Sequence, residues 1–385
     1  NTVNTVHYKK KSPMSHYRQS SLSTLDYDPD EVLQQHFADI ELESSVKPIP
    51  YSADVEFLDK LPGSSQHDVD SLKHKKVTIV GCGQVGMAIA YAILNQDICG
   101  SISLVDINEE KLDGEAKDLK QGSAFHQRVR IKASSDYSIS KGSHLVIVTA
   151  GVAQKVGESR LSLVERNVKI MSFIIPKLLE NSPNAPICIV SNPCDIMTAV
   201  AAKIAGPSVP PGQIFGSGTC LDSSRLRNLI GMALNVDTRS VHGYIIGEHG
   251  DSSTPVWSGV RAGGIPLLKP GQAPTIAHRK MHEEVVGSAM DVIQKKGYTN
   301  WAVGLTAAHI AKNVLSDTNS IIALSTCVRG LYGIENDVFL SLPCVVGGHG
   351  VRRVLCPPLD DSEKEGFQNS AKAVWEVQQG VWDSI

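Results

Sequence analysis

A glycine-rich segment close to residue 81 constrains the fold more than any other part of the chain. The β-branched run Lys76–Val80 predicts a strand, and Met87–Leu94 has helical character. Between them stands Gly81-Cys82-Gly83-Gln84-Val85-Gly86, a G-x-G-x-x-G sequence. In such a strand–turn–helix unit the three glycines permit the tight turn, the approach of a pyrophosphate and close helix–strand packing, in that order. The segment predicts an α/β fold with a Rossmann-type, doubly wound parallel sheet whose first helix N-terminus binds phosphate.

An acidic residue follows the second predicted strand. Ser101–Val105 ends in Asp106, at the distance from the glycine loop where a carboxylate can accept hydrogen bonds from an adenosine ribose. Its negative charge would repel the 2′-phosphate of NADP, so we expect NAD as the cofactor. Without the glycine loop, a solvated Asp at a strand end would be the better interpretation.

Two further strands end in polar residues on the edge where doubly wound sheets bind ligands. The buried run His144–Thr149 leads into Ala150-Gly151 and a polar loop that reaches Arg160, and such a loop can close over a substrate. Ile187–Val190 leads to Asn192, which precedes a proline and could aim its amide into the site. Arg160 also opens a long apolar helix, so a plain helix-terminal role is open to it.

The best candidate for acid–base chemistry is His249, which lies between Gly247 and Gly250 after an expected short strand, Val241–Ile246. A histidine in a glycine-rich loop is more often structural than catalytic. Asp222 and Arg225 are three residues apart on a predicted helix and therefore share one face. Such pairs are mostly solvated surface features. Here, however, Asp222 could orient the His249 ring while Arg225 binds a carboxylate.

The remaining chain predicts a C-terminal α+β substrate domain. Helical periodicity covers 275–296, 299–315 and 362–382, and apolar runs at 321–328 and 338–346 predict strands. We therefore expect an N-terminal extension at 1–75, an NAD-binding domain at 76–217 and a substrate-binding domain at 218–385. The extension is basic at first, acidic later and without periodicity, so we expect it to be largely disordered. A transit peptide is the weaker alternative, because the segment has little Arg and no clear amphipathic face.

Composition sets limits on partners and compartment. The chain of 385 residues is 42% hydrophobic and 20% charged with a net charge of −3, which indicates no nucleic-acid partner. No apolar run reaches the ~20 residues of a membrane span. The eight cysteines are scattered, with no C-x-x-C pair, as is typical of reduced core cysteines in the cytoplasm. The absence of metal-ligand spacing predicts no bound metal.

From about Lys76 to Trp382 the chain resembles the lactate/malate dehydrogenase family, and within it the L-lactate type. The matching segments are GCGQVG, GESRLSLVERNV, IVSNPCDI, GSGTCLDSSRLR, GEHGDSSTPVWSG, KGYTNWAVGL and STCVRGLYGI. They follow in order over some four-fifths of the chain. The chain departs from the family pattern at Ala153 and Val156, where an Arg and an acid are usual. The family's Arg at the first position touches the cofactor phosphates when the loop closes.

The resemblance assigns roles to the candidates. It implies that His249 is the proton donor and acceptor, paired with Asp222, that Arg160 polarises the substrate carbonyl and that Arg225 binds its carboxylate. The resemblance also implies that Asn192 and Thr299 line the substrate pocket and that Gln154 selects pyruvate, where an Arg would select a second carboxylate. It further implies a homotetramer that interconverts pyruvate and L-lactate. The cofactor-binding residues it implies are Gly81, Gly83, Gln84, Val85, Gly86, Asp106, Ala150, Gly151 and Asn192.

Two other interpretations stay open. One is a malate or other 2-hydroxyacid dehydrogenase, which Gln154 argues against. The other is a non-catalytic protein on the same fold, which Ala153 and Val156 alone support and the retained His249 and Asp222 oppose.

Overall fold

The computed structural model describes residues 72–127, 129–152, 160–269, 271–382 and 385, with only the backbone of Arg160. The chain divides into Asn1–Ser65, which lies outside the described residues, and Gln66–Ile385, which forms one compact unit. The predicted disorder of residues 1–75 therefore concerns a segment of which only the last four residues are described.

Six parallel strands form the centre of the N-terminal half, in the order β3-β2-β1-β4-β5-β6. This is the strand order of a dinucleotide-binding Rossmann sheet, so the predicted doubly wound fold is confirmed. The strands are β1 (Lys76–Val80), β2 (Ser101–Val105), β3 (Arg130–Ser134), β4 (Leu145–Val148), β5 (Ile187–Ile189) and β6 (Ile214–Gly216).

Helices bury both faces of this sheet, as the continuous apolar strands require. Along β4, Leu145 and Ile147 belong to one apolar cluster, whereas Val146 and Val148 belong to the other. The helices of this half are α2 (Gln84–Asn95), α3 (Glu109–Gln121), α4 (Arg160–Asn181) and α5 (Cys194–Ala205). α2 and α3 cover the first face, and α4 and α5 cover the second.

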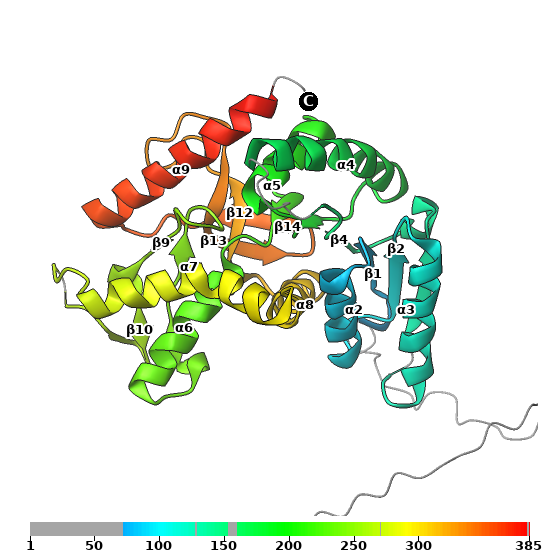
Figure 1. Cartoon of the computed structure of the whole chain (residues 1–385), viewed down its shortest axis with the longest axis horizontal. Coiled ribbons are helices and arrows are strands. Elements are labelled where there is room, and N and C mark those ends of the chain that lie inside the picture. The colour runs from blue at the N-terminus through cyan, green and yellow to red at the C-terminus, as the bar shows by residue number, and fades with distance from the viewer. Residues whose placement is uncertain (1–71, 128, 153–159, 270, 383–384) are drawn as a thin grey trace, which may run out of the picture. The chain divides into compact units, whose positions relative to one another are not determined.

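The C-terminal half continues the same sheet. The strands β12 (Ser320–Cys327), β13 (Phe339–Gly347) and β14 (Gly350–Val354) add to β6 in antiparallel fashion, with Ser325 paired to Gly216 at the junction. α8 (Trp301–Leu315) packs beside α2, and α9 (Asp361–Trp382) packs beside α4 and α5 (Figure 1). α6 (Cys220–Leu234) and α7 (Ile276–Lys296) pack together around a third apolar cluster. The two halves thus share one sheet.

The single strand expected at 241–246 is wrong. The structure has two short strands, β7 (Val241–His242) and β8 (Ile245–Ile246), which belong to different small sheets. β7 pairs with β10 (Arg261–Ala262), which also pairs with β11 (Ile265–Pro266), and β8 pairs with β9 (Thr254–Pro255). Between β7 and β8 the backbone passes so close to Val260 that a Cβ on Gly243 would lie 3.0 Å from it. Partners elsewhere in the chain decide this break, so periodicity could not reveal it.

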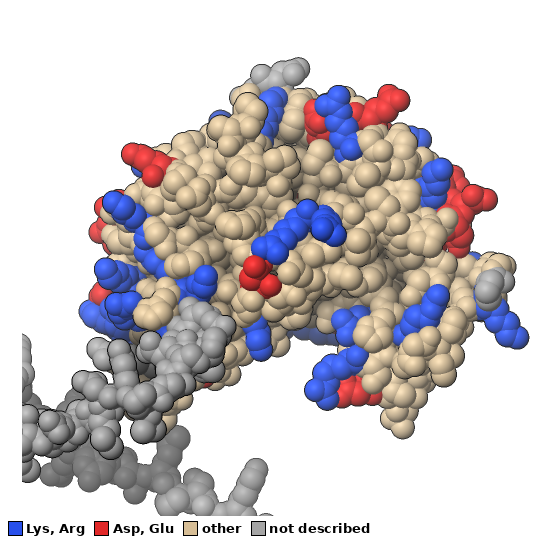
Figure 2. Space-filling model, turned by 180° about the vertical axis from the view of Figure 1, so that it is seen from behind, with Lys and Arg blue, Asp and Glu red and all other residues tan. Residues whose placement is uncertain are grey.

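Charged residues of both signs are mixed on the surface of the described part of the chain (Figure 2). On the face seen in Figure 2, Lys and Arg lie interspersed with Asp and Glu, and uncharged residues cover most of the area. Among the described helices none combines the length and the apolar character of a membrane crossing. All eight cysteines are free, and five are buried: Cys82, Cys99, Cys188, Cys194 and Cys344. This agrees with the expected reduced core cysteines.

The close packing of α2 on β1 gives a stability prediction. A Cβ on Gly86 would lie 1.9 Å from the carbonyl oxygen of Gly81, so Gly86→Ala should force α2 away from the sheet. We expect a loss of about 1–3 kcal/mol and a lower midpoint of thermal denaturation by circular dichroism. Gly114→Ala is the matched control, because Gly114 lies exposed within α3 and a Cβ added there would meet no atom within 4 Å. It should keep or raise the midpoint. Equal midpoints for Gly86→Ala and wild type would contradict the prediction.

Candidate active site

The glycine loop has the geometry that a pyrophosphate needs. Gly81 has a φ of +93°, in the left-handed region, and a Cβ there would lie 2.5 Å from the backbone of Ala150. Gly83 is the N-cap of α2, and a Cβ on it would face open space with no atom within 4 Å. Gly86 touches the Gly81 carbonyl, so only a hydrogen atom fits between helix and loop. The residues present therefore fit a dinucleotide, with the open side of the loop at Gly83 and the N-terminus of α2 beside it.

Asp106 is fixed by the backbone around it. Its Oδ2 accepts a hydrogen bond from the N–H of Cys82 at 2.6 Å, and its Oδ1 accepts one from Asn108 at 2.9 Å. The carboxylate is therefore tied to the glycine loop itself. Each oxygen keeps a lone pair with which to accept a ribose hydroxyl.

The successive backbone N–H groups of the segment 247–249 donate hydrogen bonds to three different elements. Gly247 exchanges two backbone hydrogen bonds of 2.9 Å with Ser341 of β13. The N–H of Glu248 donates to Ser370 Oγ of α9 at 2.7 Å, and that of His249 donates to Asp195 Oδ2 of α5 at 2.7 Å. Each buried donor thus has its own acceptor, which fixes the path of the loop.

A short ion pair orients the His249 ring. Its Nδ1 lies 2.5 Å from Asp222 Oδ2, and Arg225 Nη1 lies 2.8 Å from Asp222 Oδ1. The negative charge of Asp222 outweighs burial and raises the pKa of His249 to about 9. Burial raises the pKa of Asp222, but His249 and Arg225 together outweigh it and hold that pKa below its usual value. At neutral pH the pair is therefore an imidazolium facing a carboxylate.

Hydrogen bonds between the N-terminus of α6 and strand β8 fix the relative position of this pair. Thr219 Oγ1 donates to the carbonyl of Ile245 at 2.5 Å, and the Ile245 N–H donates to Ser223 Oγ at 3.0 Å. Asp222 lies between these two anchors in sequence, and His249 follows β8 by three residues. The same bonds therefore fix both members of the ion pair.

Asn192 and Gly151 belong to the other half of the site. The side chain of Asn192 is exposed, and its peptide bond to Pro193 is cis. Asn167 of α4 is fully buried, and its amide donates to the Asn192 carbonyl at 2.9 Å while its Oδ1 accepts from the Val152 N–H at 2.9 Å. One buried amide thus ties the loop that starts at Gly151 to the turn that carries Asn192.

The structure describes the other predicted site residues only in part. Thr299 lies half-buried in the short connection between α7 and α8. Arg160 is the first residue of α4, but its side chain is not described, and Gln154 lies in the segment 153–159 outside the described residues. The structure brings together His249, Asp222 and Arg225, and separately Gly81, Gly83, Gly86, Asp106, Ala150 and Gly151. Gln84 and Val85 open α2 beside them.

Two anchors of this site escaped prediction from the sequence. Asp195 holds the His249 backbone, and Asn167 holds the cofactor-side loops. The signal that could have revealed them is an acidic or amide side chain within an otherwise apolar helix, because such a group must find a partner when buried.

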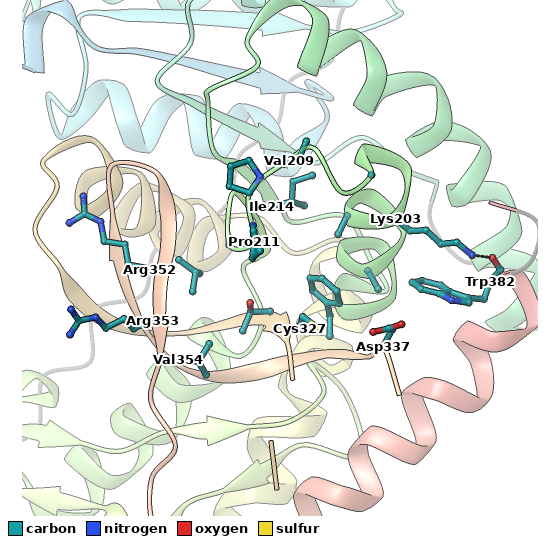
Figure 3. Close-up of a pocket in the computed structure, with 18 residues that line it drawn as sticks. Lys203, Val209, Pro211, Ile214, Cys327, Asp337, Arg352, Arg353, Val354 and Trp382 are labelled. Carbon is teal, nitrogen blue, oxygen red and sulfur yellow. Dashed lines mark hydrogen bonds between the residues drawn. The ribbon is translucent and has the colours of Figure 1, made fainter. Parts of the chain in front are cut away.

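One cavity among the described residues lies away from these side chains. It has a volume of about 500 Å³ and is enclosed by the C-terminal end of α5, strands β12–β14 and Trp382 of α9 (Figure 3). None of the predicted site residues lines it. Lys203, which lines this cavity, donates a hydrogen bond to the Trp382 carbonyl. Its Nζ also lies over the Trp382 indole, 4.3 Å from the ring centroid (Figure 3).

Comparison with known proteins assigns the family. The chain matches the NAD binding domain of lactate/malate dehydrogenase over residues 75–216 and the alpha/beta C-terminal domain of the same family over residues 219–379. It is 47% identical over 316 residues to the L-lactate dehydrogenase B chain of Sceloporus undulatus, covering 80% of this chain and 93% of that protein. It is 48% identical to the L-lactate dehydrogenase A chain of Caiman crocodilus apaporiensis over 79% of this chain and 93% of that one. The mouse L-lactate dehydrogenase B chain is 44% identical over 84% of this chain and 98% of its own length. With a Rossmann sheet, a fitting glycine loop and these matches, the chain belongs to the lactate/malate dehydrogenase family and has its NAD-binding domain.

Proposed function

We propose that this protein is an NAD-dependent L-lactate dehydrogenase, which transfers a hydride reversibly between NADH and pyruvate. The observation that carries the proposal is the 2.5 Å contact between His249 Nδ1 and Asp222 Oδ2, with Arg225 on the same carboxylate. The relatives named L-lactate dehydrogenase support it, since they align over more than nine-tenths of their own length.

His249 acts as the proton donor in pyruvate reduction. Asp222 engages Nδ1, so the transferred proton is the one on Nε2. Because the pKa of His249 is raised to about 9, the ring is protonated at neutral pH and can give this proton to the carbonyl oxygen. NADH, when bound, supplies the hydride for the carbonyl carbon. In lactate oxidation the neutral ring removes the hydroxyl proton instead.

The arginines handle the substrate's negative charge. Arg225 uses one nitrogen on Asp222, and the remaining donors of its guanidinium are available for the substrate carboxylate. We assign to Arg160 the stabilisation of charge that develops on the carbonyl oxygen. Asn192 and Thr299 line the pocket on the side of the nicotinamide and of the substrate methyl group.

We also propose a homotetramer in the cytoplasm. Large apolar side chains on α8 support subunit association, because Trp301 is 62% and Leu305 59% exposed in the single chain. The eight free cysteines support a reducing compartment.

The first kinetic prediction concerns proton transfer. Because Asp222 stabilises the protonated ring, kcat/KM for pyruvate should be flat at neutral pH and fall as pH rises through about 9, while lactate oxidation should rise through that same pH. Asp222→Asn should lower kcat by about 10²–10⁴-fold and move both limbs to lower pH, with NADH affinity by fluorescence nearly unchanged. Asp237→Asn, at an exposed Asp–Arg pair outside the site, is the control and should match wild type. Near-wild-type turnover in Asp222→Asn would refute the assignment.

The second kinetic prediction concerns the choice between NADH and NADPH. Asp106→Ser removes the ribose acceptor and the charge that repels a 2′-phosphate, so NADH should bind more weakly and NADPH relatively better. The ratio of kcat/KM for the two cofactors measures this. Asp113→Ser, at an exposed pair on α3, should leave the ratio unchanged. An unaltered ratio in Asp106→Ser would place that carboxylate outside the ribose site.

The third kinetic prediction concerns substrate choice, and it also tests the proposed lactate dehydrogenase activity. Following NADH absorbance, the wild type should reduce pyruvate far faster than oxaloacetate, because Gln154 offers no charge to a second carboxylate that is desolvated on binding. Gln154→Arg supplies a bidentate partner for that carboxylate and an unpaired charge against the pyruvate methyl. The specificity ratio should therefore move towards oxaloacetate by roughly 10²-fold. Preference of the wild type for oxaloacetate would favour a malate-type enzyme, and turnover of neither keto acid would favour a non-catalytic protein.

A further inference from the structure

A buried carboxylate lies directly behind the His249 backbone. Asp195 is 2% exposed and is the second residue of α5. Its Oδ2 accepts the His249 N–H at 2.7 Å, and its Oδ1 accepts the hydroxyl of Ser325, on β12, at 2.6 Å. An ionised carboxylate in the interior is costly unless donors satisfy it. These two donors, together with the N-terminus of α5, meet that requirement.

Asp195 connects the two halves of the site. α5 belongs to the part of the chain that matches the NAD-binding domain, whereas His249 and Ser325 belong to the part that matches the C-terminal domain. Asn192 lies three residues before Asp195, at the turn that leads into α5. This short rigid segment therefore presents Asn192 to the cofactor side and Asp195 to the His249 loop.

The carboxylate also contributes charge. Among the described residues, the charged groups that act on the imidazole are Asp222 and Arg225 from α6 and Asp195 from α5. Glu248 adjoins the imidazole in the chain, and His282 of α7 interacts with Asp222. Asp222 has the largest effect on the pKa of His249, and Asp195 raises it further. Burial raises the pKa of Asp195 itself to about 6, so its carboxyl is mostly ionised at neutral pH.

We propose that Asp195, held by Ser325, is a positioning residue that sets His249 in register with the cofactor side of the site and places a second negative charge behind its ring. Asp195 does not contact the substrate; it acts through the His249 backbone and through the field at the imidazole. The kinetic part of the proposal rests on the proposed function, and the structural part does not.

The chain offers a matched control for a purely structural role. Glu363, on α9, is also a buried carboxylate, 3% exposed, and also accepts hydrogen bonds from a backbone N–H and a hydroxyl, both of Ser258. It further accepts the N–H of Asp360, and none of these three donors belongs to the segment 247–249. Glu363→Gln therefore removes a buried charge of the same kind without touching the imidazole.

The test compares Asp195→Asn, Asp195→Ala, Ser325→Ala and Glu363→Gln in the full chain. The first readout is the pH dependence of His249 carbethoxylation by diethyl pyrocarbonate, followed by peptide mass spectrometry. It reports the protonation of His249 without any need for turnover. The second readout is kcat and KM for pyruvate, with NADH affinity measured by fluorescence.

We expect Asp195→Asn, which keeps an acceptor for the His249 N–H but loses the charge, to lower the carbethoxylation midpoint by about one pH unit. Its kcat should fall less than that of Asp195→Ala, which also loses the anchor and should fall by about 10²-fold with unchanged NADH affinity. Ser325→Ala should lower kcat by a smaller factor. Glu363→Gln should leave the midpoint at its wild-type value.

Two results would overturn the proposal. One is an unchanged midpoint in both Asp195 variants, or in Asp195→Asn alone where the Ala variant does not fold. The other is an equal shift in Glu363→Gln, which would mean that any buried charge has this effect. If the wild type failed to reduce pyruvate while the midpoint still moved in Asp195→Asn, the proposed function would fail and the positioning role would stand.

Discussion

The contact between His249 Nδ1 and Asp222 Oδ2 is the interaction on which the arrangement of the site depends. A carboxylate that is almost fully buried remains ionised only because an imidazolium and a guanidinium face it. The same carboxylate holds the ring in one orientation and keeps its pKa near 9. The ionisation of the buried carboxylate and the protonation of the ring therefore depend on one ion pair.

The backbone that carries His249 is held by hydrogen bonds to three distant elements. The successive N–H groups of Gly247, Glu248 and His249 donate to β13, α9 and α5. Elements far apart in the sequence thus converge on three adjacent peptide groups. The convergence is possible because β12 and β13 continue the parallel sheet past β6, which brings the C-terminal half against α5.

Asp195 is the α5 side chain that accepts the His249 N–H in this convergence. It lies where the sheet passes from its parallel to its antiparallel part, next to the pairing of Ser325 with Gly216. Space there is so restricted that a Cβ on Gly216 would lie 2.4 Å from Thr198 Oγ1. Close packing of this kind leaves Asp195 and the backbone of His249 little room to move relative to each other.

Local sequence determined the glycine loop, the acid after β2, the four apolar strands β1, β2, β4 and β5, and the helical pairing of Asp222 with Arg225. Each depends on neighbours within about one element, where propensity, glycine geometry and helical spacing act directly. Only the tertiary structure decided that 241–246 breaks into two strands, that polar β3 forms an edge of the sheet, and that Asp195 reaches His249. The partners in these cases lie 54 residues apart for His249 and Asp195 and 130 for Ser325 and Asp195. Which groups are buried together and hydrogen-bonded across such separations depends on how distant parts of the chain pack against each other. A local sequence pattern does not predict this packing.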